Sequence, residues 1–434
     1  MYFFGSYVDY IVQNRKGESS IKKDKMNNET EKGGRTLQTP IKTNEDIALS
    51  PPIKTASTPQ RERNAGIDLL KTLAMFMVVV LHVLGQGGVL GAAHYPNPSH
   101  AMGWWLEIES FGAVNCFAIA TGFLMVGRKI KYRKLLSLWL TVQFYNLLFY
   151  LLYLVHPIEG VTLLDVSNFF PVYSGEFWYF TAYFGLFLFI PFLNILLEKL
   201  TKKQTYTLLC TGFILFSLLF ALLGTEPFGM VGGYSLWWLM YLYFVGASIA
   251  KHKLFRQTPP ILALGIYVVC VALTFGVRML LSYAAANDLG KWNDIIKLFG
   301  QPQINYNAPL VLVGAVFLVI FCLGLHIPKP MAKFLSKLQP HLFWVYIIHL
   351  HSYIWLGVIL YRFSHFAKKP WYTLPLWVEG TALGIFAGCI LLDVCRHFLF
   401  KLLHIDGIIN RLFDGANRLY QKSKLKKAVD RFCE

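Results

Sequence analysis

Residues Ile67–Leu90 read IDLLKTLAMFMVVVLHVLGQGGVL, an apolar stretch that is long enough to cross a bilayer and that contains a lysine and a histidine. Lys71 and His82 are eleven residues apart. Eleven steps of about 100° bring an α-helix almost back to the same face, with a rise of roughly 16 Å. One face of one helix would therefore hold a cation near one membrane boundary and an imidazole towards the other. Ionisable groups inside an apolar span are costly and usually functional, so this segment predicts a membrane helix with chemistry on one face.

The composition of the 434-residue chain is that of a polytopic membrane protein. It is 55% hydrophobic, 16% aromatic and only 15% charged, which is too apolar for a soluble protein of this length. The net charge of +17 could suggest nucleic acid, but the Lys and Arg residues lie in short clusters between apolar segments, as membrane orientation requires of cytoplasmic loops. We therefore expect a lipid bilayer around the chain and no nucleic-acid partner. The seven cysteines form no spaced metal pair and no disulfide framework, and no metal site is expected.

Ten apolar spans follow the polar N-terminal region. They cover residues 67–90, 109–127, 135–155, 176–197, 205–223, 233–250, 260–284, 308–325, 341–361 and 375–400. Each is long enough to be a transmembrane helix, so the sequence predicts an all-α, polytopic integral membrane protein with about ten transmembrane helices. We expect it in the cell membrane.

The positive charges between these spans alternate in side. Clusters of Lys and Arg follow the second, fourth, sixth, eighth and tenth spans, whereas the loops 91–108, 156–175 and 224–232 contain neither residue. The positive-inside rule then places both the N- and the C-terminus in the cytoplasm. Two predicted outer loops, 285–307 and 362–374, do contain basic residues, and these could contact an anionic ligand outside.

The chain divides into three regions. Residues 1–62 are rich in polar and charged residues without an apolar period, which predicts a disordered, basic cytosolic tail. Residues 63–404 form the predicted transmembrane domain, and 405–434 form a second basic cytosolic tail.

Five short motifs resemble those of the membrane-bound acyltransferase 3 family. Arg63–His82, RNAGIDLLKTLAMFMVVVLH, is similar to the family's first helix, in which a basic residue precedes an essential histidine by eleven positions. Four further stretches resemble later helices in the same order: FGAVNCFAIATGFLM at 111–125, YRKLL at 132–136, EFWYFTAYFGLFLFIPFLN at 176–194 and LFWVYIIHLH at 342–351. The chain departs from the family at Lys71, where Arg is usual; lysine keeps the charge but lacks the bidentate fork that suits phosphate, and Arg63 could share its role.

The resemblance implies an O-acyltransferase that moves an acyl group, usually acetyl, from cytoplasmic acetyl-CoA to a hydroxyl of a cell-surface or lipid-linked glycan. Acetyl-CoA would be a donor substrate and not a permanently bound cofactor. His82 could be the general base, because an imidazole can accept a proton at neutral pH. Lys71 could bind the phosphates of CoA as a point charge. The structural alternatives are a packed His82 that is hydrogen-bonded to a neighbour, and a Lys71 that reaches the lipid headgroups or pairs with Asp68.

Other polar residues in the apolar spans are weaker candidates for the substrate site. Asn115 could face the site or form an interhelical hydrogen bond, and Thr121, six residues later, would not share its face. Glu176, beside Trp178, could orient a sugar hydroxyl or mark the water boundary. Arg278 could bind an anionic acceptor, reach the outer interface, or pair with a buried acid, for which Glu379 and Asp393 are the candidates.

Tyr346 and His349 are spaced i, i+3 and should share a helix face, from which they could line the cavity. His341 and His351 are less favoured. Gly122 and Gly246 are expected to permit close helix packing.

Two other classes of function fit an apolar chain of this kind. A secondary transporter or a glycan flippase would also have an even number of spans and few buried charges, but such proteins often contain repeats with broken helices at matching positions, and none is visible in the sequence. A non-catalytic membrane sensor or scaffold is the third class, and no soluble receiver domain accompanies the spans.

Overall fold

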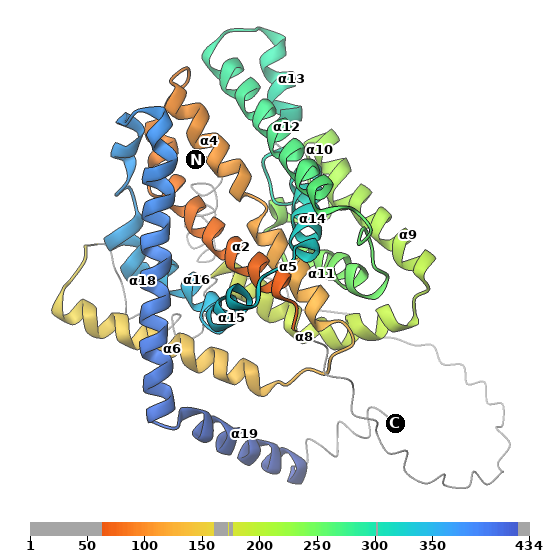
Figure 1. The fold of residues 1–434 in the computed structure, drawn as a ribbon, viewed down its shortest axis with the longest axis vertical. Helices are drawn as coiled ribbons and strands as arrows, with labels where there is room; N and C mark the ends of the chain where they lie inside the picture. The colour runs from red at the N-terminus through yellow and green to blue at the C-terminus, as the bar shows by residue number, and fades with distance from the viewer. Residues whose placement is uncertain (1–62, 160–171, 173–176, 301–302, 424–434) are drawn as a thin grey trace, which may run out of the picture. The chain divides into compact units, whose positions relative to one another are not determined.

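The computed structural model describes residues 63–159, 172, 177–300 and 303–423 (Figure 1). This part of the chain is helical and contains no strand. The predicted tail 1–62 and the candidate Glu176 lie outside it. Its longer helices are α2 (Ala65–Leu84), α4 (Pro98–Ser110), α5 (Ala113–Met125), α6 (Arg133–Val155), α8 (Trp178–Lys199), α9 (Lys202–Phe213), α11 (Leu236–Lys251), α12 (Pro260–Ala286), α13 (Lys291–Gly300), α14 (Pro309–Gly324), α15 (Lys329–Leu338), α16 (Leu342–Leu350), α18 (Leu374–Leu402) and α19 (Ile405–Lys422). Shorter turns lie at α3 (Val89–Ala92), α10 (Leu219–Leu223) and α17 (Ser352–Ile354).

Helix α2 is the central element of the bundle (Figure 1). It contacts α4, α5, α14, α15, α16 and α18. Asn64 begins it, because its side-chain oxygen accepts a hydrogen bond from the Ile67 N–H at 3.1 Å and so satisfies a free donor of the first turn. Lys71 and His82 both lie on this single helix, as predicted.

Close packing of α5 against α11 depends on two glycines. A Cβ atom at Gly122 would overlap the backbone of Tyr243, and one at Gly246 would overlap the backbone of Ile119. The prediction that these glycines permit close helix approach is therefore confirmed.

Seven helices of the described residues are long and apolar enough to cross a membrane, and an eighth is possible if a bent pair counts as one span. Helices α11 and α14, which correspond to the predicted sixth and eighth spans, have only 16 residues each. Helices α6, α12 and α18 leave most of their apolar windows unburied, as lipid-facing helices would. The chain is thus a multi-pass membrane protein.

Residues 91–108, predicted to form a loop, are largely helical, so the prediction of a loop was wrong. Helix α4 begins at Pro98, which suits the first helical position, and Asn97 caps it by accepting the Ser99 N–H at 2.8 Å. Together α4 and α5 form one span, Pro98–Met125, of 28 residues. A loop without Lys or Arg is ambiguous, since the same composition can lie in the membrane.

The predicted span 341–361 is broken. Helix α16 ends at Leu350, and the following helical segment, Ser352–Lys368, is bent from it by 61°. His351 at the break has φ −59° and ψ 134°, which is an extended conformation. Broken helices inside membrane proteins occur where backbone is buried in protein or lines a site, so the end of α16 is a natural place to look for function.

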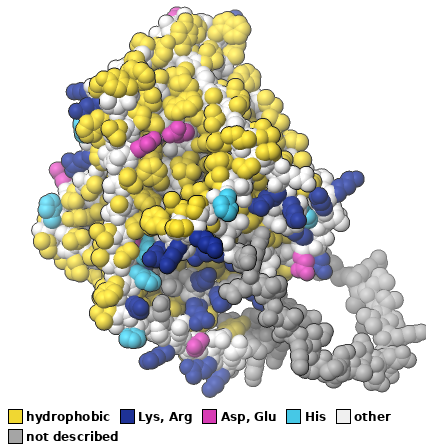
Figure 2. Space-filling model, in the orientation of Figure 1, with side chains coloured by type: hydrophobic (Ala, Val, Ile, Leu, Met, Phe, Trp, Pro, Cys, Tyr) yellow, Lys and Arg dark blue, Asp and Glu magenta, His cyan; other side chains and the backbone are white. Residues whose placement is uncertain are grey.

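Hydrophobic side chains cover most of the upper part of the visible face in Figure 2, and Lys and Arg side chains gather across its lower part. Lys329, Lys333 and Lys337 lie on α15. Arg411, Arg418 and Lys422 lie on α19, which occupies the first part of the predicted C-terminal tail. The six cysteines among the described residues are all free.

Candidate active site

Helices α2 and α16 bring two histidines into direct contact. His82, in the last turn of α2, and His349, in the last turn of α16, are 267 residues apart in the sequence, and their Nδ1 and Nε2 atoms are 2.9 Å apart. The His349 side chain is fully buried. Trp355, just after the break in α16, packs edge-on against the His82 ring at 5.6 Å between centroids. Both histidines are candidates from the sequence, but their contact across 267 residues was not predicted.

The hydrogen bonds of this pair fix where each proton lies. The Nδ1 atom of His349 bonds to the backbone carbonyl of Val345, one turn earlier. Because a carbonyl oxygen can only accept, Nδ1 of His349 donates, and Nε2 of the neutral ring must accept. His82 therefore donates from Nδ1, which leaves its own Nε2 with a free lone pair. Among the described residues nothing is bonded to that nitrogen, and His82 keeps part of its surface exposed.

No third ligand accompanies the two imidazoles. Within the described ranges no group of three or more His, Cys, Asp or Glu side chains could hold a metal ion. The hydrogen bond between the two rings orients one imidazole against the other.

Tyr346 shares the face of α16 with His349, as the i, i+3 spacing predicted. The two rings meet edge-on at 6.4 Å. The Tyr346 hydroxyl accepts a hydrogen bond from the backbone N–H of Tyr179 at 3.2 Å, which satisfies one of the free donors at the start of α8. This bond places the start of α8, which contains Trp178, beside α16.

Lys71 lies at the other end of α2. It is half-buried, eleven residues before His82 and therefore roughly 16 Å away along the helix axis. The Nε2 atom of Gln339 donates to the Asp68 carbonyl at 3.0 Å and to the Thr72 hydroxyl at 3.2 Å, which ties the end of α15 to the turn that contains Lys71. Arg63, just before the helix, is exposed.

Residues 64–394 match the model of a family described as an acyltransferase domain. The chain belongs to this family, the acyltransferase 3 family named from its motifs. No curated protein and no solved structure matches it. The matched range contains both histidines and Lys71, and it makes the chain a membrane acyltransferase.

Two candidates from helix α5 of the acyltransferase have structural partners. Asn115 is fully buried; its Nδ2 donates to the Tyr306 carbonyl at 2.7 Å, and its Oδ1 accepts from the Trp238 indole N–H at 3.0 Å. These bonds favour the packing alternative for Asn115. The Thr121 hydroxyl donates to the Phe117 carbonyl of its own helix at 2.9 Å.

Arg278 does not pair with either acid that the sequence suggested. Its guanidinium lies 3.8 Å from the centre of the Trp104 ring, in a cation–π contact, and no ion pair joins it to Glu379 or Asp393 within the described residues. Asp393 was one of two candidate partners for Arg278, and that candidate is wrong, because its carboxylate accepts hydrogen bonds from closer donors.

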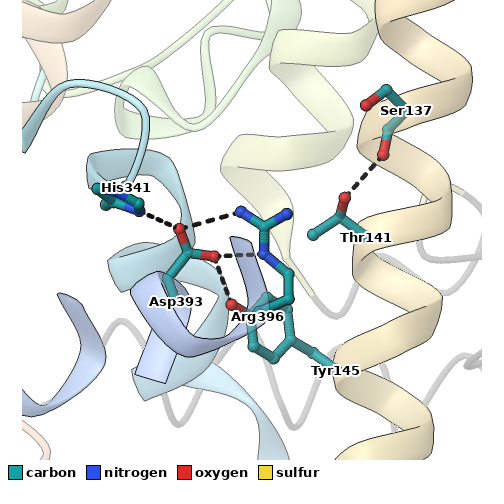
Figure 3. A network of polar contacts seen from close by, with 6 residues as sticks. All are labelled: Ser137, Thr141, Tyr145, His341, Asp393 and Arg396. Carbon is teal, nitrogen blue, oxygen red and sulfur yellow. Dashed lines mark hydrogen bonds and ion pairs between the residues drawn. The ribbon is translucent and has the colours of Figure 1, made fainter. Parts of the chain in front are cut away.

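Asp393 instead joins three helices in a network shown in Figure 3. Its Oδ1 accepts from the Tyr145 hydroxyl at 2.5 Å and from Arg396 Nε at 2.7 Å. Its Oδ2 accepts from His341 Nδ1 at 2.6 Å and from Arg396 Nη2 at 3.1 Å. All four acceptor positions of the carboxylate are thus used, and it can neither take a substrate proton nor bind a ligand. The i, i+3 spacing of Asp393 and Arg396 was the signal that could have revealed the pair.

The Asp393 network supports the active site from a distance. His341 immediately precedes α16, so its bond to Asp393 fixes the start of the helix whose last turn contains His349. Tyr145 extends the same support to α6.

Replacing Asp393 should be strongly destabilising. Asp393→Ala leaves the buried Arg396 without its partner, and breaking a buried ion pair in this way costs about 3–5 kcal/mol of unfolding free energy. Thr141→Val is the matched control. Among the described residues the buried Thr141 hydroxyl, also drawn in Figure 3, donates only to the Ser137 carbonyl of its own helix and not to Asp393. Thermal unfolding of the detergent-solubilised protein should show a large loss for Asp393→Ala and little change for Thr141→Val. Equal melting temperatures for Asp393→Ala and the wild type would contradict the structural role.

Proposed function

We propose that this membrane acyltransferase is an O-acyltransferase that transfers an acyl group, in the first instance acetyl, from cytoplasmic acyl-CoA to a hydroxyl of a cell-surface or lipid-linked glycan, with His82 as the general base. The observation that carries the proposal is the hydrogen-bond order of the histidine pair. It leaves the Nε2 lone pair of His82 available and its Nδ1 proton held by His349. A base for hydroxyl activation needs this arrangement.

The reaction follows from that proton arrangement. The acceptor hydroxyl gives its proton to Nε2 of His82 as its oxygen attacks the thioester carbonyl, and a C–O bond forms. The C–S bond then breaks, and the CoA sulfur takes the proton from the imidazolium, so that the products are the O-acyl ester and CoA. While His82 is positively charged, its Nδ1–H bond to His349 is charge-assisted and stronger, which stabilises the imidazolium.

The donor would approach from the end of α2 that contains Lys71. CoA presents phosphates at one end and the thioester at the other, with the flexible pantetheine arm between them. Lys71 and His82 would lie on one helix face, roughly 16 Å apart. Lys71 would contact the phosphates at one end of CoA, and His82 would act as the base at the thioester end. The acceptor would then reach His82 from the opposite side of the membrane.

The proposed donor path requires ten membrane spans with both termini in the cytoplasm. The two 16-residue helices α11 and α14 would be two of these spans. The basic helices α15 and α19 would then face the cytoplasm, in keeping with the positive-inside rule.

In whole cells, a membrane-impermeant thiol reagent should label a cysteine placed at the exposed His94 and not one at the exposed Lys333. The reverse pattern would invert the protein and remove the donor path along α2.

Replacing His82 should remove catalysis and leave the fold intact. His82→Ala and His82→Gln should each lower the turnover by about 10²–10⁴-fold, since neither alanine nor an amide can accept the proton. His349→Gln should lower turnover less, because His82 keeps its base nitrogen but loses the partner that orients it. The measurement is the transfer of label from acetyl-CoA to glycan by the purified chain. Wild-type turnover by His82→Gln would sink the assignment of the base.

Replacing Lys71 should act on the donor and not on the chemical step. Lys71→Ala should raise the KM for acetyl-CoA with kcat nearly unchanged, because it removes a contact that is present before and during transfer. Lys71→Arg should retain the wild-type KM or lower it, since Arg adds a planar fork suited to phosphate. A wild-type KM in Lys71→Ala would show that Lys71 only reaches the membrane boundary.

A further inference from the structure

Arg278 is a positively charged side chain inside the apolar span Pro260–Ala286 that has no acidic partner. Among the described residues no ion pair joins its guanidinium to an Asp or a Glu, and its buried Nε atom has no hydrogen-bond partner. The guanidinium lies over the face of the Trp104 ring, 3.8 Å from the ring centre. This cation–π contact is attractive, but it supplies neither a negative charge nor a hydrogen-bond acceptor of the ordinary kind.

Trp104 has an unused donor beside that charge. Its indole Nε1 is buried and likewise has no acceptor in the part of the chain that the structure describes. A buried N–H without a partner is costly, and the side chains of arginine and tryptophan can only donate. Two side chains in contact therefore lack an acceptor, and one of them also lacks a counter-charge. A single oxyanion would supply both.

The neighbouring histidine does not supply the acceptor. The His100 ring lies 6.3 Å from the Trp104 ring between centroids, but both of its nitrogens are already engaged. Its Nδ1 donates to the Ala93 carbonyl at 2.9 Å, and its Nε2 lies 2.9 Å from the hydroxyl oxygen of Ser282. Neither nitrogen is left to accept from Arg278. The two bonds also tie the start of α4 to α12, and so they hold the facing donors in place.

The Arg278–Trp104 pair lies between α4 and α12, at the end of the bundle where α2 ends (Figure 1). Arg278 is about two turns before the end of α12, and Trp104 is about two turns after the start of α4. Both side chains are half-buried, so a ligand can reach them without unfolding the bundle. His82 is in the last turn of α2, so the pair is at the end that the acceptor would approach and not at the Lys71 end.

We propose that Arg278 and Trp104 bind an oxyanion, a phosphate or a carboxylate, that is part of the acceptor. Arg278 supplies the charge and Trp104 a neighbouring N–H donor, while the aromatic ring holds the guanidinium in place. The position favours the acceptor over a phospholipid, because the donors lie between two helices and inside their ends, whereas lipid phosphates lie at the ends of the spans. The inference rests on the proposed function, since it makes the glycan acceptor an acidic one.

Thermal unfolding of the purified full chain tests the anion site without any assay of transfer. The chain is held in phospholipid-free dodecyl maltoside, and sodium phosphate is compared with sodium chloride at equal ionic strength. A ligand that binds only the folded state raises the melting temperature, and phosphate that acts elsewhere on the chain raises it equally in all variants. The rise should be about 2 °C larger in the wild type than in Arg278→Gln, which has no charge. Trp104→Phe keeps the ring and removes only the N–H, so it should lose part of the rise.

Arg256→Gln and Trp105→Phe are the matched controls. Arg256 is exposed and lies before the other end of α12, and Trp105 packs against Phe275 of the same helix at 5.4 Å between ring centroids. Both variants should keep the full wild-type rise. An equal rise in the wild type and in Arg278→Gln would overturn the site. Should Arg278→Gln not fold, Trp104→Phe decides, and a full wild-type rise in that variant would overturn the site as well.

Two further measurements test whether the oxyanion belongs to the acceptor. In the same detergent, KM values are determined for radiolabelled acetyl-CoA and for the unacylated surface glycan from a strain in which the gene is deleted. Arg278→Gln should raise the KM for the glycan about tenfold and leave that for acetyl-CoA unchanged. An unchanged glycan KM, with a phosphatidylglycerol molecule that the wild type retains in native mass spectrometry and Arg278→Gln loses, would assign the site to lipid and overturn the proposal.

Failure of this site and failure of the proposed function give different results. If the wild type labels the glycan, His82→Ala does not, and Arg278→Gln behaves as the wild type in both measurements, only the anion site is wrong. If the wild type transfers no label, or His82→Ala transfers it normally, the proposed function is wrong, and the phosphate-induced rise still shows whether Arg278 and Trp104 bind an oxyanion.

Discussion

The hydrogen bond between Nδ1 of His82 and Nε2 of His349 is the interaction on which the rest of the site depends. It joins the central helix α2 to the broken helix α16, and it determines which nitrogen of His82 is free. The bond has this direction only because the Val345 carbonyl, which cannot donate, occupies the other nitrogen of His349. A backbone carbonyl thus sets the protonation of a side chain in another helix.

The remainder of the bundle holds those two helices in register. At one end of α16, the Asp393 carboxylate uses all four acceptor positions on donors from α6, α18 and the residue before α16. At the other end, the 61° bend separates His349 from the following segment, whose Trp355 packs against His82. In a bilayer, where water cannot satisfy stray polar groups, such complete networks favour one arrangement of helices over its alternatives.

Local patterns were sufficient to predict part of the site. The eleven-residue spacing of Lys71 and His82 placed them on one helix, and the i, i+3 spacing of Tyr346 and His349 placed them on one face. Both follow from helix geometry alone. The contact between His82 and His349 spans 267 residues and depends on how α2 and α16 cross, which no local pattern specifies.

The errors have the same cause. Asp393 was offered as a partner for Arg278, but packing placed Arg396, Tyr145 and His341 around it first. Residues 91–108 were interpreted as an outer loop because they lack Lys and Arg, whereas Asn97 and Pro98 begin helix α4 there.

The protonation pattern of the histidine pair is the most direct test of the central claim, and it can be observed by nitrogen NMR. The full chain, labelled with ¹⁵N-histidine and reconstituted in lipid, should be measured at neutral pH, with His82→Gln and His349→Gln spectra used to assign the two rings among the twelve histidines. Both rings should be neutral with the proton on Nδ1, and Nε2 of His82 should have the chemical shift of an unprotonated nitrogen. A proton on Nε2 of His82 in the resting protein, with Nδ1 unprotonated, would contradict the account, because the base would then point at His349 and not at the acceptor.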